Sequence, residues 1–297
     1  MARSEARQLS GKVVAITGGA RGIGLATARA CAARGMKVGI GDLDAAEAES
    51  AAESVPGAIG LPLDVTKRDS FEAFLDGVDA QLGPVDVLIN NAGIMPVGPF
   101  VDEDDMTAVR MVDINVHGVL LGMKLALPRF LARGTGHLVN IASTAGKAGI
   151  PGGATYSGTK HFVVGVSEAV RGELRDTPVE VSCVMPVVVN TELATGLQAS
   201  RGVKKVEPED VGAEIVAALE QPRFDVYVPR SMGPVFQVTG ALPRKAREAV
   251  SRAFKADKVL AGADRDARRG YELRAAHSEP GLEPGDEVKQ LPGHAGD

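Results

Sequence analysis

The sequence has few of the features that mark secreted, membrane-spanning or zinc-dependent proteins. It contains no tryptophan and only two cysteines in 297 residues. Cys31 and Cys183 lie in apolar segments, so we expect small core residues in a reducing compartment rather than a disulfide. No uncharged run approaches the ~18 residues that a spanning helix needs, and residues 1–12 lack the apolar centre of a secretory signal. These absences predict a cytoplasmic protein without a metal site.

Charge and composition narrow the class further. The net charge of −5 gives the whole molecule no basic character, so we expect no nucleic-acid partner. Apolar residues make up 44% of the chain and charged residues 24%, which is ordinary for a soluble globular protein. The length suffices for one large domain or two small ones with a sizeable core.

Short apolar segments alternate with helix-favouring segments along most of the chain. The segment KVVAIT at 12–17 is followed by a glycine-rich turn, an alanine-rich helix and a second apolar segment, which together make a βαβ unit. The apolar segments are continuous rather than alternating, as expected when helices cover both faces of a sheet. We therefore predict an α/β, doubly wound (Rossmann-type) fold over residues 8–242, with seven parallel strands at 12–17, 37–42, 58–65, 85–93, 137–143, 179–186 and 224–229.

The composition changes in the C-terminal extension, residues 243–297. Residues 243–274 carry ten Lys or Arg against five Asp or Glu, with a few apolar side chains at roughly helical spacing. We expect a surface helix with a solvated polar face, followed by a Pro- and Gly-rich irregular tail. The alternative is a basic amphipathic segment that contacts a membrane surface or a partner protein.

The glycine-rich turn predicts a dinucleotide site. Gly18, Gly22 and Gly24 fall directly after the first strand, in TGGARGIG, which also contains Arg21 and Ile23. Glycines at this point let the backbone and the helix N-terminus approach a pyrophosphate closely. A plain strand-to-helix turn would not need three glycines in seven residues.

Asp42 predicts the choice of dinucleotide. It ends the second strand, where a carboxylate can accept hydrogen bonds from an adenosine ribose. The same carboxylate would repel the 2′-phosphate of NADP. Arg21 could pair with that phosphate, but its side chain is long and free to face solvent. We therefore favour NAD over NADP.

Ser143, Tyr156 and Lys160 are the candidate catalytic residues. Tyr156 and Lys160 are four residues apart, so they share one face of a helix over 153–175. Ser143 ends the strand segment HLVNIAS, and a strand end can face a helix. Tyr-x-x-x-Lys alone is a weak pattern, but it follows a dinucleotide loop in this chain.

Together, TGGARGIG, the NNAG sequence at 90–93 and the Ser143, Tyr156, Lys160 set resemble the classical short-chain dehydrogenases/reductases over about residues 8–240. The resemblance implies a catalytic trio of Ser143, Tyr156 and Lys160, with Asn115 supporting a water that leads to the lysine. It implies that Asp64 and Val65 hold the adenine ring. It also implies cofactor contacts for the NNAG residues Asn90, Asn91, Ala92 and Gly93, and for Pro186, Val189 and Thr191 beside the nicotinamide. Val187 departs from the family, which usually has glycine after the proline.

The resemblance implies oxidation of an alcohol, or reduction of a carbonyl, by hydride transfer. The alcohol proton must leave with the hydride, so a base is required. Free tyrosine titrates near 10, and we expect the positive charge of Lys160 to lower the pKa of Tyr156. Ser143 can orient and polarise the substrate oxygen. His117 and His161 show no nucleophile partner or metal-ligand spacing, and we expect neither to be catalytic.

The expected substrate pocket is apolar. It includes Met95, Ile150, Val187 and Leu193, beside Ser143 and Tyr156, and predicts a lipophilic secondary alcohol or ketone; core packing is the other explanation. Residues 194–205 are a candidate mobile lid. The alternatives are an NADPH-dependent carbonyl reductase on the same fold and a non-catalytic dinucleotide-binding sensor or scaffold. The resemblance also implies a homodimer or homotetramer.

Overall fold

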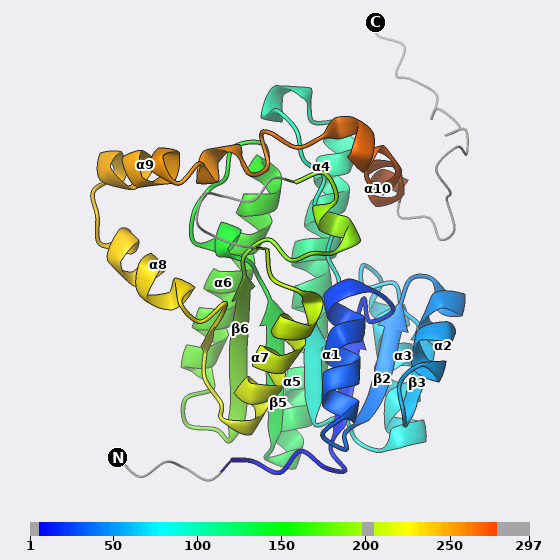
Figure 1. Cartoon of the computed structure of the whole chain (residues 1–297). Helices are drawn as coiled ribbons and strands as arrows, with labels where there is room; N and C mark the ends of the chain where they lie inside the picture. Colours follow the sequence, from blue (N-terminus) through cyan, green and yellow to red (C-terminus); the bar gives the residue numbers. More distant parts are fainter. Residues whose placement is uncertain (1–5, 198–204, 278–297) are drawn as a thin grey trace, which may run out of the picture.

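A computed structural model describes residues 6–197 and 205–277 of the chain, and its centre is one parallel seven-stranded sheet. The strand order is β3-β2-β1-β4-β5-β6-β7, and the labelled strands β3, β2, β5 and β6 follow this order from right to left in Figure 1. The strands are β1 (Val13–Thr17), β2 (Lys37–Asp42), β3 (Ala58–Pro62), β4 (Val87–Asn90), β5 (Gly136–Ile141), β6 (Val179–Pro186) and β7 (Asp225–Val228). The predicted doubly wound fold is confirmed.

Alternate residues of each strand face opposite sides of the sheet, and each side has its own apolar cluster. On β1, Val14 and Ile16 pack into one cluster, and Val13 and Ala15 pack into the other. Because both sides are apolar, the strands read as continuous hydrophobic segments. The first cluster is covered by α1 (Gly22–Ala32), α2 (Ala45–Glu53) and α7 (Pro208–Glu220), and the second by α3 (Arg68–Leu82), α5 (Gly118–Arg133) and α6 (Ala154–Glu173).

The strand order reverses between β1 and β4, and this reversal places the site. In open α/β sheets a crevice forms at such a switch point, outside the carboxyl ends of the strands. The glycine turn after β1 and the NNAG sequence after β4 both lie there.

The helix-favouring segment 103–133 predicts one long helix, but in the structure this helix is interrupted. The structure has a short 3₁₀ turn, η1 (Phe100–Asp102), then α4 (Asp105–Val112), a π-helical turn, η2 (Asp113–His117), and α5. The side chain of Asn115, inside η2, bonds both the N–H and the C=O of Ile94 at 2.9 Å. Single π-helical turns inside α-helices are frequent at functional sites, so this turn marks Asn115 as a candidate functional residue.

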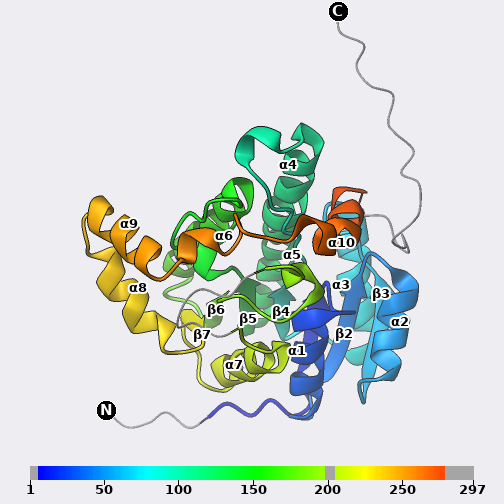
Figure 2. The same cartoon turned by 45° about the horizontal axis from the view of Figure 1, so that its top comes forward.

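The C-terminal segment contains α8 (Met232–Gly240), α9 (Arg244–Ala253), the 3₁₀ turn η5 (Ala256–Lys258) and α10 (Arg265–His277). Helix α9 has no buried residue, as expected for a surface helix. Helix α10 differs: it crosses above the carboxyl end of the sheet beside α4, and its Arg268 is 1% exposed (Figure 2). Helix α10 has the expected solvated face, with Arg265, Asp266 and Arg269 exposed, but its other face carries a buried cation that bonds to two earlier loops.

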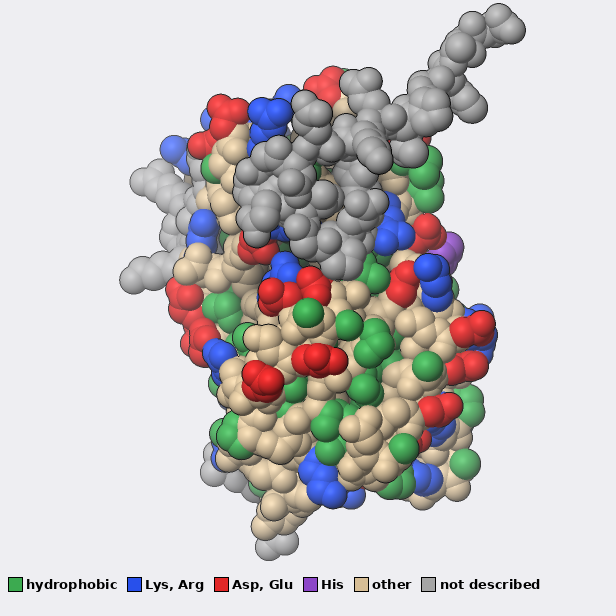
Figure 3. Space-filling view, turned by 90° about the vertical axis from the view of Figure 1, so that its right-hand side faces the viewer, with side chains coloured by type: hydrophobic (Ala, Val, Ile, Leu, Met, Phe, Trp, Pro, Cys, Tyr) green, Lys and Arg blue, Asp and Glu red, His purple; other side chains and the backbone are tan. Residues whose placement is uncertain are grey.

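Acidic and basic side chains are interspersed over the described part of the face that includes α2 and α3 (Figure 3). Within residues 6–197 and 205–277, no helix has both the length and the apolar character needed to cross a membrane.

Candidate active site

A continuous cavity of about 1670 Å³ lies at the carboxyl ends of the strands. It extends from the glycine turn and Asp42, past Ser143 and Tyr156, to the C-terminal helices. The structure thus brings together almost every residue singled out in the sequence. The predicted residues that line the cavity are Gly18, Arg21, Gly22, Ile23, Asp42, Asp64, Val65, Asn91, Ala92, Gly93, Met95, Ser143, Ile150, Tyr156, Lys160, Pro186, Val187, Val189, Thr191 and Leu193.

The glycine turn is shaped by close contacts and a left-handed backbone. Gly18 has a φ of +59°, and a Cβ there would lie 2.9 Å from Ala92 Cα. Gly24 lies outside the cavity lining, and a Cβ on it would lie 2.2 Å from Gly18 O. A side chain at either position would therefore push the turn out of shape. The turn and the N-terminus of α1 therefore form a concave stretch of backbone, the cradle, whose N–H groups can bind a pyrophosphate.

Asn91 holds this turn against β4. Its Nδ2 donates to the carbonyls of Thr17 and Gly18 at 2.9 and 2.8 Å, and its N–H donates to Thr17 Oγ1 at 3.0 Å. Asn90 instead points into the core, where its Nδ2 donates to Asn140 at 2.8 Å. The two asparagines of NNAG therefore have different structural tasks.

Asp42 lies at the other end of the cradle. Its carboxylate accepts from the N–H of Ala20 at 3.2 Å and the N–H of Asp44 at 3.4 Å. Burial raises the pKa of this carboxyl, while the two backbone bonds and the Arg21 charge act in the opposite direction.

Arg21 is turned toward acidic residues of α2. Its guanidinium lies 3.8 Å from Asp44 Oδ2 and 3.7 Å from Glu47 Oε2, and its side chain is 48% exposed. It is therefore already paired, although weakly, with carboxylates.

Asp64 and Val65 line the cavity after β3. Burial acts to raise the pKa of Asp64, but hydrogen bonds from Thr66 and the charge of Lys67 outweigh it and leave the pKa low. Thr66 Oγ1 donates to Asp64 Oδ1 at 2.6 Å, which fixes the turn that carries both residues.

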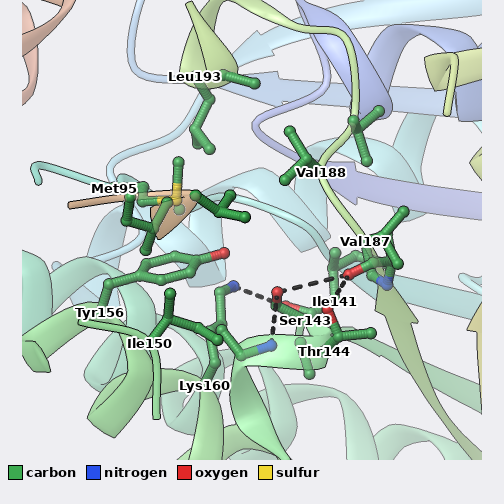
Figure 4. Close-up of a pocket in the computed structure, with 18 of the residues that line it drawn as sticks. Met95, Ile141, Ser143, Thr144, Ile150, Tyr156, Lys160, Val187, Val188 and Leu193 are labelled. Carbon is green, nitrogen blue, oxygen red and sulfur yellow. Dashed lines mark hydrogen bonds between the residues drawn. The ribbon is translucent and has the colours of Figure 1, made fainter. Parts of the chain in front are cut away.

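Ser143, Tyr156 and Lys160 converge in the cavity from β5 and α6. Ser143 follows β5, and its Oγ accepts from the N–H of Ala145 at 3.1 Å. Lys160 Nζ donates to the carbonyl of Ile141 at 2.8 Å and lies 5.8 Å from the centre of the Tyr156 ring. Figure 4 shows the Tyr156 hydroxyl directed toward Ser143 and Lys160, with apolar side chains on the other side.

Both titratable groups are buried, and this changes their proton affinities. Burial raises the pKa of Tyr156 to about 12, against a smaller opposite effect of the Ser143 hydroxyl. Burial lowers the pKa of Lys160 to about 8. The expected lowering of the Tyr156 pKa by Lys160 is therefore absent from the protein alone, because desolvation of the phenolate is the larger effect.

Asn115 lies beside the candidate catalytic residues and does not line the cavity. It is completely buried, and its Nδ2 also donates to Thr159 Oγ1 at 3.1 Å. A Cβ on Gly93 would lie 3.1 Å from Asn115 Oδ1 and 3.6 Å from Lys160 Nζ. Asn115 thus packs the β4 loop against the helix that carries Tyr156 and Lys160.

The segment after β6 forms the wall opposite the glycine turn. Val189 makes an isolated parallel bridge with Val206, and Thr191 Cγ2 lies 3.2 Å from where a Gly22 Cβ would be. The N–H of Val187 donates to the carbonyl of Val228 at 2.9 Å. The backbone at Val187 is therefore held by β7, and the β-branched side chain causes no break in this path.

The cavity walls around Tyr156 are largely apolar, while the lining at α9 is charged, with Arg244, Arg247 and Glu248. Met95, Tyr156 and Leu197 are buried in one cluster, with Ile150, Val188 and Leu193 packed against it. Val259 and Leu260 of the C-terminal segment belong to the same cluster. Most of the candidate lid, 198–204, lies outside the described residues.

Sequence reasoning missed the residues that α10 adds to this end, above all Arg268 and Tyr271. The hydroxyl of Tyr271 accepts from the N–H of Met95 at 2.6 Å. Val259 and Leu260 are among the apolar side chains of the C-terminal extension, but no sequence signal marks Arg268 as buried.

Comparison with known proteins agrees with this geometry. The sequence model described as short chain dehydrogenase matches residues 12–202. The chain is 36% identical to a glycine betaine reductase of Emericella nidulans, over 72% of this chain but only 18% of that protein. It is 33% identical to 2-(S)-hydroxypropyl-CoM dehydrogenase 3 of Xanthobacter autotrophicus, over 79% of this chain and 98% of that one.

A solved structure with a similar fold is the 3-ketoacyl-(acyl-carrier-protein) reductase from Brucella melitensis complexed with NADH. The TM-score is 0.67 at 30% identity, and the match covers 75% of this chain and 99% of that chain.

Proposed function

The chain belongs to the short-chain dehydrogenase/reductase family, and on that premise we propose that it interconverts a lipophilic secondary alcohol and its ketone with NAD. It is an oxidoreductase that acts on CH–OH groups with a nicotinamide dinucleotide. The observation that carries the proposal is one cavity with a glycine cradle at one end and Ser143, Tyr156 and Lys160 beside apolar walls at the other.

Each part of the chain has a defined task in the proposed reaction. The glycine turn and Asp42 hold the dinucleotide, and Lys160 binds its nicotinamide ribose. When bound, the oxidised nicotinamide supplies the hydride acceptor and a positive charge. Tyr156 receives the alcohol proton, or gives its own proton to the ketone in reverse, and Ser143 donates a hydrogen bond to the same oxygen.

In the protein without bound dinucleotide, the buried Tyr156 holds its proton at neutral pH. A phenol with its pKa raised to about 12 is protonated and can act as the acid for a ketone. In oxidation the same residue must lose a proton, so this direction should gain rate as the pH rises.

The proposed choice of NAD rests on Asp42 and on the pairing of Arg21. Asp42 faces the cavity, and Arg21 is engaged by Asp44 and Glu47. The 2′-phosphate of NADP would therefore meet a carboxylate, while Arg21 already has two acidic neighbours. This argues against the NADPH-dependent reductase, and the intact catalytic set argues against a scaffold.

The lipophilic substrate class rests on cavity size and lining. The cavity exceeds the roughly 300–1,000 Å³ typical of a single ligand site, which leaves room for a bulky substrate beside the dinucleotide. The walls around Tyr156 come from Met95, Ile150, Val188 and Leu193.

A homodimer or homotetramer is part of the proposal. Met106 and Val109 on α4 and Phe162 on α6 are exposed apolar side chains, and a second subunit would cover them. Light scattering of the purified chain at several concentrations tests this; a monomer throughout would refute it.

The test of function is NADH formation from a panel of sterols, retinoids and long-chain secondary alcohols. Tyr156→Phe should lower kcat by about a hundredfold or more and leave NAD affinity within about a factor of three of the parent. The matched control is Thr135→Val, which removes a hydroxyl from an exposed position just before β5, outside the cavity lining. Substantial turnover in Tyr156→Phe would sink the assignment.

A further inference from the structure

Helix α10 reaches back to the substrate end of the cavity through one buried cation. Arg268 Nη1 donates to the carbonyls of Leu193 and Thr195, both at 2.9 Å. Its Nη2 donates to the carbonyl of Met95 at 2.7 Å, and its Nε donates to Glu272 Oε1 at 2.7 Å. The guanidinium therefore binds two loops that are almost a hundred residues apart in the sequence.

The neighbours of Arg268 strengthen the same attachment. Tyr271 accepts from the N–H of Met95, and its ring lies 4.9 Å from the Arg268 guanidinium carbon. Glu272 Oε1 also accepts from the N–H of Val97 at 3.3 Å. Both backbone polar groups of Met95 are thus bonded to α10, and the buried charge is paired and hydrogen-bonded.

Both loops contribute side chains to the pocket around Tyr156. Met95 and Leu193 line the cavity, and Figure 4 shows both on the same side of the Tyr156 ring, with Leu193 farther from it. The planar guanidinium fixes directions as well as distances, because its donors lie in one rigid fork. The placement of the two loops relative to each other therefore depends on the hydrogen bonds of Arg268.

We propose that Arg268 is a positioning residue that ties the Met95 loop to the Leu193 loop and thereby sets which substrates the pocket accepts. This inference rests on the proposed function, since it concerns the substrate of the same site. A helix that only stabilised the fold could bond anywhere on the surface. Here three of the four acceptors of the cation belong to the loops around the substrate.

The first measurement is hydrogen–deuterium exchange on the full chain. In Arg268→Met, amides of residues 94–98 and 191–197 should exchange at least about tenfold faster, since hydrogen bonds to a charged group are lost. The matched control is Arg269→Met, which removes an exposed cation from the next position of α10. Arg268→Lys keeps the positive charge but lacks the planar set of guanidinium donors, so its exchange rates should lie between those of the parent and of Arg268→Met.

The second measurement is substrate selectivity at saturating NAD, with 2-butanol and a 3-hydroxysteroid as probes. In Arg268→Met, the kcat/KM values for 2-butanol and the 3-hydroxysteroid should differ about tenfold less than in the parent protein. The reason is that a small displacement of the groups that position the substrate has a large effect on rate. The change should lie mainly in KM, with NAD affinity unaffected. Arg269→Met should keep the parent ratio.

The outcomes separate the two proposals. If Arg268→Met left hydrogen exchange unchanged in residues 94–98 and 191–197, Arg268 would not hold the two loops together. If exchange became faster but the ratio of the two kcat/KM values stayed the same, Arg268 would stabilise the loops without affecting substrate selectivity. If the parent protein oxidised no alcohol at all, the proposed function would fall, while exchange would still decide the tie. If Arg268→Met did not fold, Tyr271→Phe would replace it; loss of the Met95 contact should then loosen residues 94–98 and leave 191–197 protected.

Discussion

Asp42 is fixed by backbone amides in an orientation suited to a ribose. The N–H groups of Ala20 and Asp44 hold its two oxygens, so the carboxylate needs little reorganisation to accept hydroxyl protons. Asp44 and Glu47 make this end of the cavity acidic, and the Arg21 guanidinium lies near the carboxylates of both. The proposed preference for NAD over NADP therefore rests on this carboxylate.

Asp42→Asn should shift the preference toward NADP. Removing one like charge beside the 2′-phosphate is worth about 1–2 kcal/mol, or about five- to thirtyfold in the ratio of the two dissociation constants. Fluorescence titration with both dinucleotides measures this ratio. Glu53→Gln removes the same charge from an exposed position of α2 and should leave the ratio unchanged. Equal affinity for both dinucleotides in the parent protein would contradict the argument.

Residues differ in how far the sequence reveals their roles. Asp42, Tyr156 and Lys160 were identified because each lies at a fixed offset from a strand, turn or helix that can be recognised locally. Arg268 has no such pattern: its partner Met95 is 173 residues away. Its neighbours on α10 are mostly polar, so nothing local separates it from a solvated arginine.

At the scale of elements, the sequence predicted the strands well and one helix boundary poorly. Strands covered on both sides are continuous apolar segments, and β6 and α7 match the predicted ranges. The region 103–133 also has a continuous helical pattern, which conceals the π-helical turn at Asp113–His117. That turn follows from the bonds between Asn115 and Ile94, a long-range contact without a local signature.

Strand β5 contains a buried histidine that should make stability depend on pH. His137 is 4% exposed and bonds Ser182 Oγ at 2.9 Å. Burial lowers its pKa from 6.5 to about 3, with a smaller contribution from Arg7. Below pH 6.5 the unfolded chain therefore binds a proton that the folded chain does not. The free energy of unfolding is therefore unaffected by the titration of this histidine above pH 6.5 and decreases as the pH falls from 6.5 toward 3.

When the pH is lowered from 7.5 to 5, His137 should reduce the free energy of unfolding by about 2 kcal/mol. Urea unfolding of the parent and of His137→Gln at both pH values measures the loss. The variant should be less stable at pH 7.5 but lose about 2 kcal/mol less on acidification. An equal loss in both proteins would show that His137 does not titrate in this range.

At the scale of the whole molecule, the cavity joins the two halves of the sheet. Its lining includes the turn after β1 and the segment after β6, on either side of the switch point. A dinucleotide that contacts both should stabilise the molecule as one unit rather than either half. The chain contains two internal reporters of this coupling: Cys31 is buried in the cluster on one side of the sheet, and Cys183 in the cluster on the other.

Both thiols should therefore react only through unfolding, and at matched rates. Burial raises the pKa of each thiol to about 12, so the folded protein presents neither an accessible sulfur nor a thiolate. Labelling with a thiol reagent, followed by peptide mass spectrometry, gives the two rates separately. NAD at a hundred times its dissociation constant should slow both about a hundredfold, because only the folded state binds it. If one cysteine reacted quickly and ignored NAD, its side of the sheet would open independently, and the single cooperative unit inferred from the shared cavity would be wrong.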